Sequence, residues 1–382
     1  MQQDASMAVA PAAAFLDTKP HYDILDGLRG VAALVVILYH VFECFDWSPA
    51  PHGYLAVDFF FVLSGFVIGY AYDNRWHSMS TMTFFRRRLI RLHPMVIMGA
   101  VLGALTFLLQ GSVRWDGTHV AFRMVMVALL LNMFMLPLGP GARADVRGNG
   151  EMFPLNGPNW SLFFEYIGNI LYALLLRRLP TKALAAVAVV TGALLMGVAV
   201  HDGYLGVGWS MVDGGFWSGL VRMLFPYTVG MLMARVFRPV RIRGAFWLCG
   251  AVIVLVALLP AGVTGSAPWA CGVYDALCVI VVFPLLVWLG ASELQVRPVT
   301  RRVSRLLGDL SYPLYAVHYP FMYLFYALIG FDGDLVPIAK LREVWPQALI
   351  LPVGCILLAW LCLKFYDLPL RRRLHAPRVE NR

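Results

Sequence analysis

The sequence has few charged side chains for its length. Of its 382 residues only 14% are Asp, Glu, Lys or Arg, whereas 60% are apolar; a typical soluble domain has about 25% charged residues. A soluble fold of this size could not bury so much apolar surface. The low charge therefore excludes an ordinary soluble protein and predicts an integral membrane protein.

Paired cysteines and a cleavable leader are also lacking. The six cysteines mostly lie in apolar runs and form no C-x-x-C pair, which argues against a disulfide framework and against a metal site. The first residues have no early positive cluster and contain Asp4 and Asp17, unlike a signal peptide. We predict a flexible cytosolic tail over residues 1–21, one membrane domain over 22–373, and a cytosolic tail over 374–382.

Positive charge is present, but it is clustered. The net charge of +9 would suit a nucleic-acid partner if it were spread along the chain. Instead the arginines gather in short tracts between apolar runs, which is typical of loops on the cytosolic side of a membrane. The charge therefore indicates topology and no nucleic-acid partner. The five clusters lie at residues 86–91, 177–182, 235–243, 297–305 and 371–373.

Eleven apolar runs are close to the length needed to cross a bilayer, which is roughly 17 to 25 residues. They lie near 28–46, 55–72, 92–110, 121–138, 159–176, 183–200, 217–236, 244–260, 269–290, 309–330 and 346–366. If all five basic clusters are cytosolic, an even number of spans separates each pair, yet three runs lie between Arg91 and Arg177. The run at 121–138 begins beside Arg123 and precedes a Gly-rich stretch, so we expect it to be re-entrant or interfacial. The sequence thus predicts an all-α polytopic bundle of about ten transmembrane helices plus that segment, with both termini cytosolic.

Arg29 and His40 interrupt the first span, and ionisable residues inside a span indicate function. Eleven residues bring a helix round to within about 20° of its starting face with a rise of about 16 Å. One face therefore presents a cation near the cytosol and an imidazole deep in the membrane. That separation suits a pantetheine arm, with phosphates at Arg29 and a thioester at His40, and histidine is a natural base for a hydroxyl acceptor. A snorkelling Arg29 and a packing His40 fit the spacing equally well.

Two carboxylates lie near the same depth. Asp58 is close to the start of the second span and Glu165 close to the start of the fifth. Either one would hold the His40 tautomer and stabilise the imidazolium, as the third member of a catalytic triad does. An interhelical hydrogen bond or ion pair that only packs the bundle is the alternative for each.

Arg88 and Arg91 lie three residues apart in FFRRRLIRLHP and share a helix face. Arginine presents a fork that matches phosphate oxygens, so the pair would clamp the phosphates of coenzyme A. Arginines at this point also serve simply as topology anchors.

Tyr312, Tyr315 and His318 recur at a spacing of three in LSYPLYAVHYPF. Aromatic and imidazole groups on one face suit a sugar or another polyol acceptor. A purely structural cluster also accounts for this motif.

Taken in order, these segments resemble the acyltransferase 3 family of bacterial membrane proteins. LDGLRGVAALVVILYH, AVDFFFVLSGFVI, RRRLIRLHP, WSLFFE and LSYPLYAVHYP match its successive motifs. The resemblance implies an O-acyltransferase of the bacterial cytoplasmic membrane that draws on cytosolic acyl-CoA, with acetyl favoured, and modifies a hydroxyl of a cell-surface polysaccharide, glycolipid or macrolide. Acyl-CoA is then a donor substrate, and no permanently bound cofactor is expected.

The predicted site residues follow from both sources. We expect His40 to be the catalytic base with Asp58 or Glu165 orienting it, and Arg29, Arg88 and Arg91 to bind the donor. The acceptor is expected at four residues of the late motifs, namely Trp160, Ser161, Tyr315 and His318.

Two questions stay open from the sequence. The appended periplasmic domain of some family members has no counterpart after residue 373, so transfer is expected to finish within the membrane domain or on a separate periplasmic partner. A transporter or flippase for a polyol or glycolipid is the rival function, since buried charges also serve transport.

Overall fold

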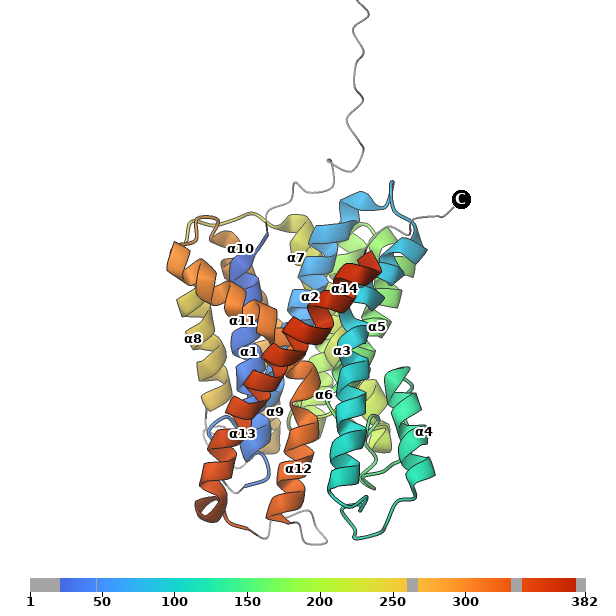
Figure 1. Ribbon diagram of the computed structural model, residues 1–382. Coiled ribbons are helices and arrows are strands. Elements are labelled where there is room, and N and C mark those ends of the chain that lie inside the picture. The colour runs from blue at the N-terminus through green and yellow to red at the C-terminus, as the bar shows by residue number, and fades with distance from the viewer. Residues whose placement is uncertain (1–20, 46, 260–266, 331–338, 376–382) are drawn as a thin grey trace, which may run out of the picture.

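The computed structural model describes residues 21–375 except 46, 260–266 and 331–338, and these residues fold almost entirely into helices (Figure 1). Two isolated β-bridges are the only extended pairings within these ranges. Nearly all of the predicted tails, 1–21 and 374–382, lie outside the described residues, which exclude 1–20 and 376–382. The helices are α1 (Asp23–Phe42), α2 (Ala56–Tyr72), α3 (Thr81–Leu109), α4 (Phe122–Met133), α5 (Asn159–Leu174), α6 (Thr181–Asp202), α7 (Gly215–Val236), α8 (Ala245–Leu258), α9 (Pro268–Leu277), α10 (Phe283–Ser292), α11 (Pro298–Val317), α12 (Tyr319–Ile329), α13 (Leu341–Cys362) and α14 (Leu368–His375).

Within the described residues, six helical stretches are long and apolar enough to cross a membrane. They are Asp23–Phe42, Gly53–Arg75, Thr81–Leu109, Thr181–Asp202, Pro268–Ser292 and Leu341–Leu374. The last two are continuous because π-helical turns at Cys278–Val282 and Leu363–Asp367 join α9 to α10 and α13 to α14. The prediction of an all-α, multi-pass membrane bundle is confirmed for the described chain, whereas the count of ten spans stays a prediction.

Small residues allow the central helices to pack closely. α1 packs along α11, and α2 packs along α7. A Cβ added at Gly65 would lie 2.0 Å from the Tyr227 carbonyl oxygen, and one added at Gly230 would lie 2.2 Å from the Val62 carbonyl oxygen. Only glycine fits at these two positions. Small residues of this kind let the backbones of neighbouring membrane helices approach each other closely.

The run at 121–138, which we expected not to cross, contains the short helix α4. Its 12 residues rise about 18 Å, less than the roughly 30 Å of hydrocarbon. α4 lies beside one half of α3 (Figure 1). The chain then folds back, and the Leu138 amide donates to the Met152 carbonyl at 2.9 Å. The length of α4 favours the predicted non-crossing segment.

The tenth predicted span, 309–330, is not one helix. It breaks at His318 between α11 and α12. Pro320 has no N–H to bond the carbonyl one turn earlier, and the freed Ala316 carbonyl accepts instead from the Asn156 amide at 2.9 Å. The break places the His318 side chain at a junction inside the bundle.

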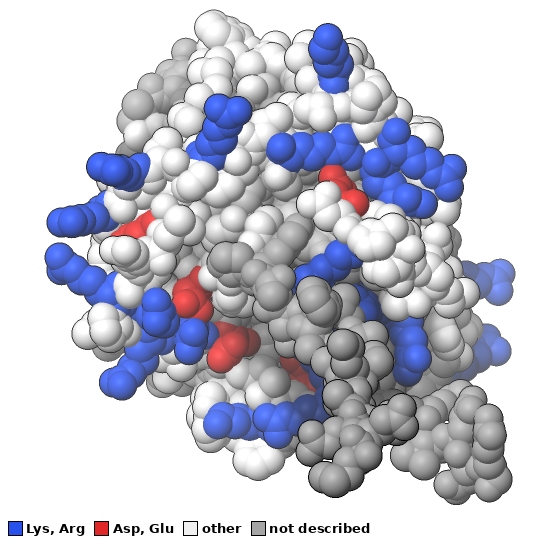
Figure 2. Space-filling model, turned by 90° about the horizontal axis from the view of Figure 1, so that it is seen from above, with Lys and Arg blue, Asp and Glu red and all other residues white. Residues whose placement is uncertain are grey.

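The basic clusters gather at one end of the bundle. Arg86 donates to the Leu374 carbonyl at 3.4 Å, Arg235 donates to the Leu179 carbonyl at 2.6 Å, and Arg305 pairs with Asp23 at 2.9 Å. Figure 2 shows this end, with Lys and Arg spread around its rim and few acidic side chains. Basic clusters that are far apart in the sequence therefore meet at one end of the bundle. This arrangement requires an even number of spans between each pair of clusters.

Candidate active site

Two cavities meet inside the bundle. The first, here called the arginine cavity, is lined by Arg29, Arg88 and Arg91 and lies toward the basic end. The second, the histidine cavity, is lined by His40 and has a volume of about 330 Å³, against about 70 Å³ for the first. Val57 and Tyr315 line both cavities, so the two spaces adjoin at these side chains.

The arginine cavity brings together all three arginines that were predicted to bind the donor. Arg88 is buried and pairs with Glu165 at 2.6 Å, while Arg29 lies 3.6 Å from Asp26 on its own helix. Arg91 lines the cavity, and no carboxylate among the described residues pairs with it. Three guanidinium groups face one carboxylate on the lining, and this excess of positive charge suits a polyphosphate.

His40 lies in the last turn of α1 and pairs with a carboxylate one turn further along the chain. Its Nδ1 is 2.9 Å from Glu43 Oε1, and the Tyr326 hydroxyl also donates to Glu43 at 2.7 Å. A carboxylate only accepts, so this bond assigns the proton to Nδ1 and leaves the lone pair on Nε2. The pair has the geometry that prepares an imidazole to accept a proton. Sequence reasoning missed Glu43, although its position three residues after His40 places it on the same helical face.

The prediction that Asp58 or Glu165 orients His40 is wrong. Both carboxylates are bonded to arginines instead. Asp58 accepts from Arg222 at 2.6 Å in a pair that is 0% and 1% exposed, and Glu165 accepts from Arg88 at 2.6 Å. Both were expected near the depth of His40, yet Glu165 lines the arginine cavity and not that of His40, and helix rotation decides which way each side chain points. A catalytic role for either carboxylate stays a prediction.

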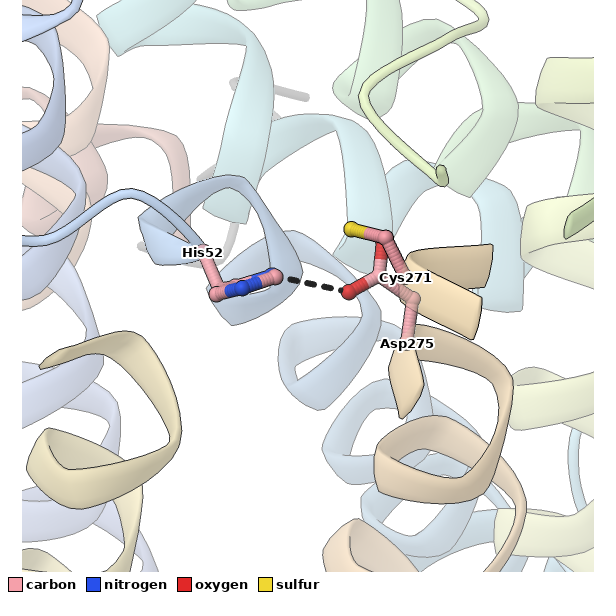
Figure 3. A group of neighbouring side chains, drawn as sticks. All are labelled: His52, Cys271 and Asp275. Atoms are coloured by element: carbon pink, nitrogen blue, oxygen red, sulfur yellow. Dashed lines mark hydrogen bonds and ion pairs between the residues drawn. The ribbon is translucent and has the colours of Figure 1, made fainter. Parts of the chain in front are cut away.

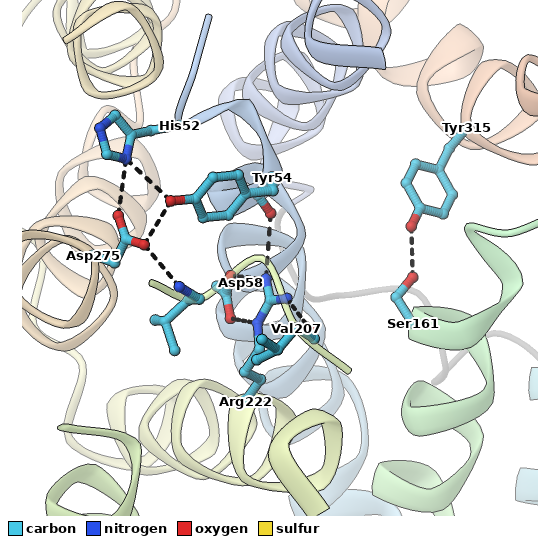
Figure 4. Close-up of polar contacts among 9 residues, drawn as sticks. His52, Tyr54, Asp58, Ser161, Val207, Arg222, Asp275 and Tyr315 are labelled. Carbon is cyan, nitrogen blue, oxygen red and sulfur yellow. Dashed lines mark hydrogen bonds and ion pairs between the residues drawn. The ribbon is translucent and has the colours of Figure 1, made fainter. Parts of the chain in front are cut away.

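Arg222 anchors one wall of the histidine cavity. Besides Asp58 it donates to the Val207 and Tyr54 carbonyls at 2.6 and 3.3 Å (Figure 4), and its guanidinium lies 5.0 Å from the Trp160 ring centroid. This network fixes Trp160, a predicted acceptor residue, on the cavity lining.

The other predicted acceptor residues, Ser161, Tyr315 and His318, do not share one cavity. The Tyr315 hydroxyl lies 2.6 Å from the Ser161 hydroxyl (Figure 4), and Ser161 lines the arginine cavity only. His318 is 0% exposed and lines neither cavity; its ring stacks on His40 at 5.5 Å between centroids. The Leu314 and Tyr315 carbonyls accept from its Nδ1. His318 therefore packs against the His40 ring within the bundle and does not contact either cavity.

Glu151 on the histidine cavity was also missed. It belongs to the segment between α4 and α5, and it accepts from the Asn149 amide at 2.7 Å and from the Tyr323 hydroxyl. Burial raises the pKa of this carboxyl, although the two donors and the nearby Arg147 act in the opposite direction. Glu151 lies in none of the motifs singled out in the sequence. Its pairing with Tyr323 could not be read from the sequence either, because the two residues are far apart along the chain.

Three side chains outside both cavities have the chemistry of metal ligands. The ligand atoms of His52, Cys271 and Asp275 lie within 4.8 Å of one another (Figure 3). His52 Nδ1 is 3.0 Å from Asp275 Oδ1, and the other carboxylate oxygen accepts from the Tyr54 hydroxyl at 2.7 Å and the Leu205 amide at 2.8 Å (Figure 4). These bonds satisfy the buried carboxylate within the protein. The cluster therefore acts as a brace between α9 and the turn that precedes α2.

Comparison with known proteins adds independent findings. A family model described as an acyltransferase domain matches residues 22–365. "Protein 2 in picA locus" of Rhizobium radiobacter is 35% identical over 47% of this chain and 94% of its own length. "Acyltransferase MdmB" of Streptomyces mycarofaciens is 28% identical over 81% of both chains, and the "putative membrane-bound transacylase BcsY" of Komagataeibacter xylinus is 26% identical over 78% of this chain and 72% of its own. No solved structure gives a significant match.

Proposed function

This chain belongs to the acyltransferase 3 family, whose domain it matches over residues 22–365, and we propose that it moves an acyl group from cytosolic acyl-CoA to a sugar hydroxyl. Acetyl is the proposed acyl group, and a cell-surface polysaccharide or glycolipid is the proposed acceptor. The resemblance predicted from the motifs is confirmed, and so is the assignment as a membrane acyltransferase. The donor and the acceptor belong to the proposal.

The donor binds in the arginine cavity. Arg29, Arg88 and Arg91 hold the phosphates of coenzyme A at the basic end. Glu165 keeps the Arg88 fork in place by accepting from it at 2.6 Å, and the Ser64 hydroxyl donates to Glu165 at 2.8 Å. The pantetheine arm extends about 16 Å along α1, the rise from Arg29 to His40. The thioester then lies where the two cavities adjoin.

The acceptor hydroxyl enters the histidine cavity and meets the thioester carbonyl there. As its oxygen bonds to the carbonyl carbon, His40 Nε2 takes the hydroxyl proton, and Glu43 stabilises the imidazolium that forms. When the C–S bond breaks, the thiolate leaves with the electron pair of that bond and takes the proton from His40. The products are an ester and free coenzyme A, and His40 is neutral again.

The proposed orientation follows from the distribution of charge. The end that carries the basic clusters faces the cytosol, where acyl-CoA is found, and the histidine cavity opens on the opposite side of the bacterial cytoplasmic membrane. The starts of α1 and α3 and the short α14 lie at the basic end (Figure 1), which supports the proposal that both termini are cytosolic. A separate periplasmic partner would receive the acyl group only if the final acceptor cannot reach the cavity.

The observation that carries this proposal is the meeting of the cavities at Val57 and Tyr315, with three arginines on one side and the His40–Glu43 pair on the other. It is tested with purified protein in nanodiscs, by following thiol release from acetyl-CoA and label transfer to an offered glycoside. We expect glycoside-dependent release that is lost in His40→Ala and in the Arg88→Ala, Arg91→Ala double variant. Arg123→Ala, at an exposed arginine on α4, is the matched control for the double variant. A polyol transporter would release no coenzyme A with any glycoside, and that result would contradict the proposal.

A further inference from the structure

The histidine cavity carries unmatched negative charge. Glu43 and Glu151 both line it. The cationic side chain on its lining, Arg222, is already neutralised by the buried Asp58 at 2.6 Å. With His40 neutral, as its proposed role as a base requires, the described lining has two carboxylates and no unpaired cation, while the buried Arg147 acts on Glu151 from outside the lining.

Glu151 is held in place over the cavity by backbone pairing. It forms a β-bridge with Ser210, and the Met152 amide donates to the Trp209 carbonyl at 3.0 Å. Burial raises the pKa of the Glu151 carboxyl, whereas the Tyr323 hydroxyl, the Asn149 amide and Arg147 all favour its ionised form. Two segments far apart in sequence thus fix a carboxylate and the Trp209 ring on one cavity wall.

The remaining lining is mostly aromatic. Rings from Tyr39, Tyr54, Trp160, Tyr204 and Trp209 face this space. Aromatic faces pack against the C–H faces of a pyranose, and ionised carboxylates accept hydrogen bonds from hydroxyl or ammonium groups without donating any. A carboxylate or phosphate on the ligand would instead meet two like charges in a medium of low effective dielectric, where repulsion is strong.

We propose that the histidine cavity selects sugars without negative charge, so that its acceptor is a neutral or aminated glycoside and uronic acids or other anionic sugars are rejected. The inference rests on the proposed function for the identity of this cavity as the acceptor site. The charge discrimination itself is a property of binding, and it is measured without an acyl donor.

The test uses three matched probes on the full-length protein in nanodiscs without acetyl-CoA: methyl glucoside, methyl glucosaminide and methyl glucuronide. Saturation-transfer NMR titrations at low salt give the relative affinities. We expect the glucuronide to bind at least tenfold more weakly than the glucoside, which corresponds to about 1.4 kcal/mol, and the glucosaminide to bind at least as tightly as the glucoside. Adding acetyl-CoA afterwards tests the proposed function separately, through thiol release.

Variants assign the discrimination to the cavity. Glu151→Gln should narrow the ratio of glucoside to glucuronide affinity by threefold or more, whereas Asp213→Asn, at an exposed carboxylate in a left-handed turn that Asn tolerates, should leave it unchanged. If Glu151→Gln does not fold, raising the salt concentration on the unchanged protein should narrow the same ratio by screening. Equal binding of glucoside and glucuronide, failure of every uncharged probe to bind, or a ratio that neither Glu151→Gln nor salt alters would overturn the inference.

Discussion

Replacing Glu43 by Gln isolates the contribution of the carboxylate that holds His40. The change keeps the size of the side chain and the acceptor oxygen for the Tyr326 hydroxyl, which donates to Glu43 at 2.7 Å. It removes the negative charge 2.9 Å from His40 Nδ1. A hydrogen bond to a charged group contributes about 1.5–3 kcal/mol, so we expect transfer to fall by about 10- to 150-fold.

The loss should appear in kcat and leave coenzyme A binding intact. Glu43 acts on the imidazolium, which forms only as the proton is transferred, so the ground-state complex loses little. His40→Ala should cost more, roughly 10²- to 10⁴-fold. Because Glu43 acts only through His40, the double variant should be no slower than His40→Ala alone.

The assay is single-turnover transfer per folded, coenzyme-A-binding molecule, with Asp213→Asn as the control for loss of an exposed carboxylate. Normalising to molecules that bind coenzyme A removes any effect on folding. A Glu43→Gln rate within about threefold of the parent, or a double variant in which the two losses multiply, would refute the pairing of Glu43 with a catalytic His40.

Three further results are expected. Arg88→Ala and Arg91→Ala should each weaken coenzyme A binding, measured by calorimetry, by about 10- to 150-fold through loss of charged hydrogen bonds; unchanged affinity in the double variant would remove the arginine cavity as the donor site. Arg222→Ala leaves Asp58 buried without its partner and should destabilise the protein by about 3–5 kcal/mol, seen as a lower Tm, and a Tm equal to the parent's would show that the pair is not buried in the membrane-embedded protein. In a cysteine-free background, Asp116→Cys, at an exposed loop position, should react with an impermeant maleimide in intact spheroplasts, whereas a cysteine among the basic-end arginines should react only in inverted vesicles; the reverse pattern would overturn the orientation.

The axial positions of the site residues were readable from the sequence. Helix rise and periodicity place Arg29 and His40 on one face of α1, and they place Arg88 and Arg91 together on α3. In the structure Arg29, Arg88 and Arg91 line one cavity and His40 lines the adjoining one. These relations are local, so the helix geometry alone determines them.

The partners of the buried carboxylates were not readable. Asp58 bonds to Arg222, which lies 164 residues later, and only the rotation and packing of α2 against α7 bring the two together. Hydropathy carries no information on rotation, since a helix buried on all sides has no distinct polar face. For the same reason the role of Glu151 could not be predicted, because its partner Tyr323 is distant in the sequence. Glu43 could have been predicted, because it lies three residues after His40 on the same helical face.

Tyr315 and Val57, the side chains shared by the two cavities, also affect the energetics of the membrane. In the proposed orientation one cavity opens to each side, and a continuous file of water through both would let protons run down the membrane potential, about 2.3 kcal/mol per charge for every 100 mV. The Tyr315 hydroxyl is tied to the Ser161 hydroxyl at 2.6 Å and to the Pro158 carbonyl at 3.2 Å. Under the proposed function, the side chains at which donor and acceptor meet are therefore also those that keep the two water-filled spaces apart, so that acyl transfer opens no path for ions.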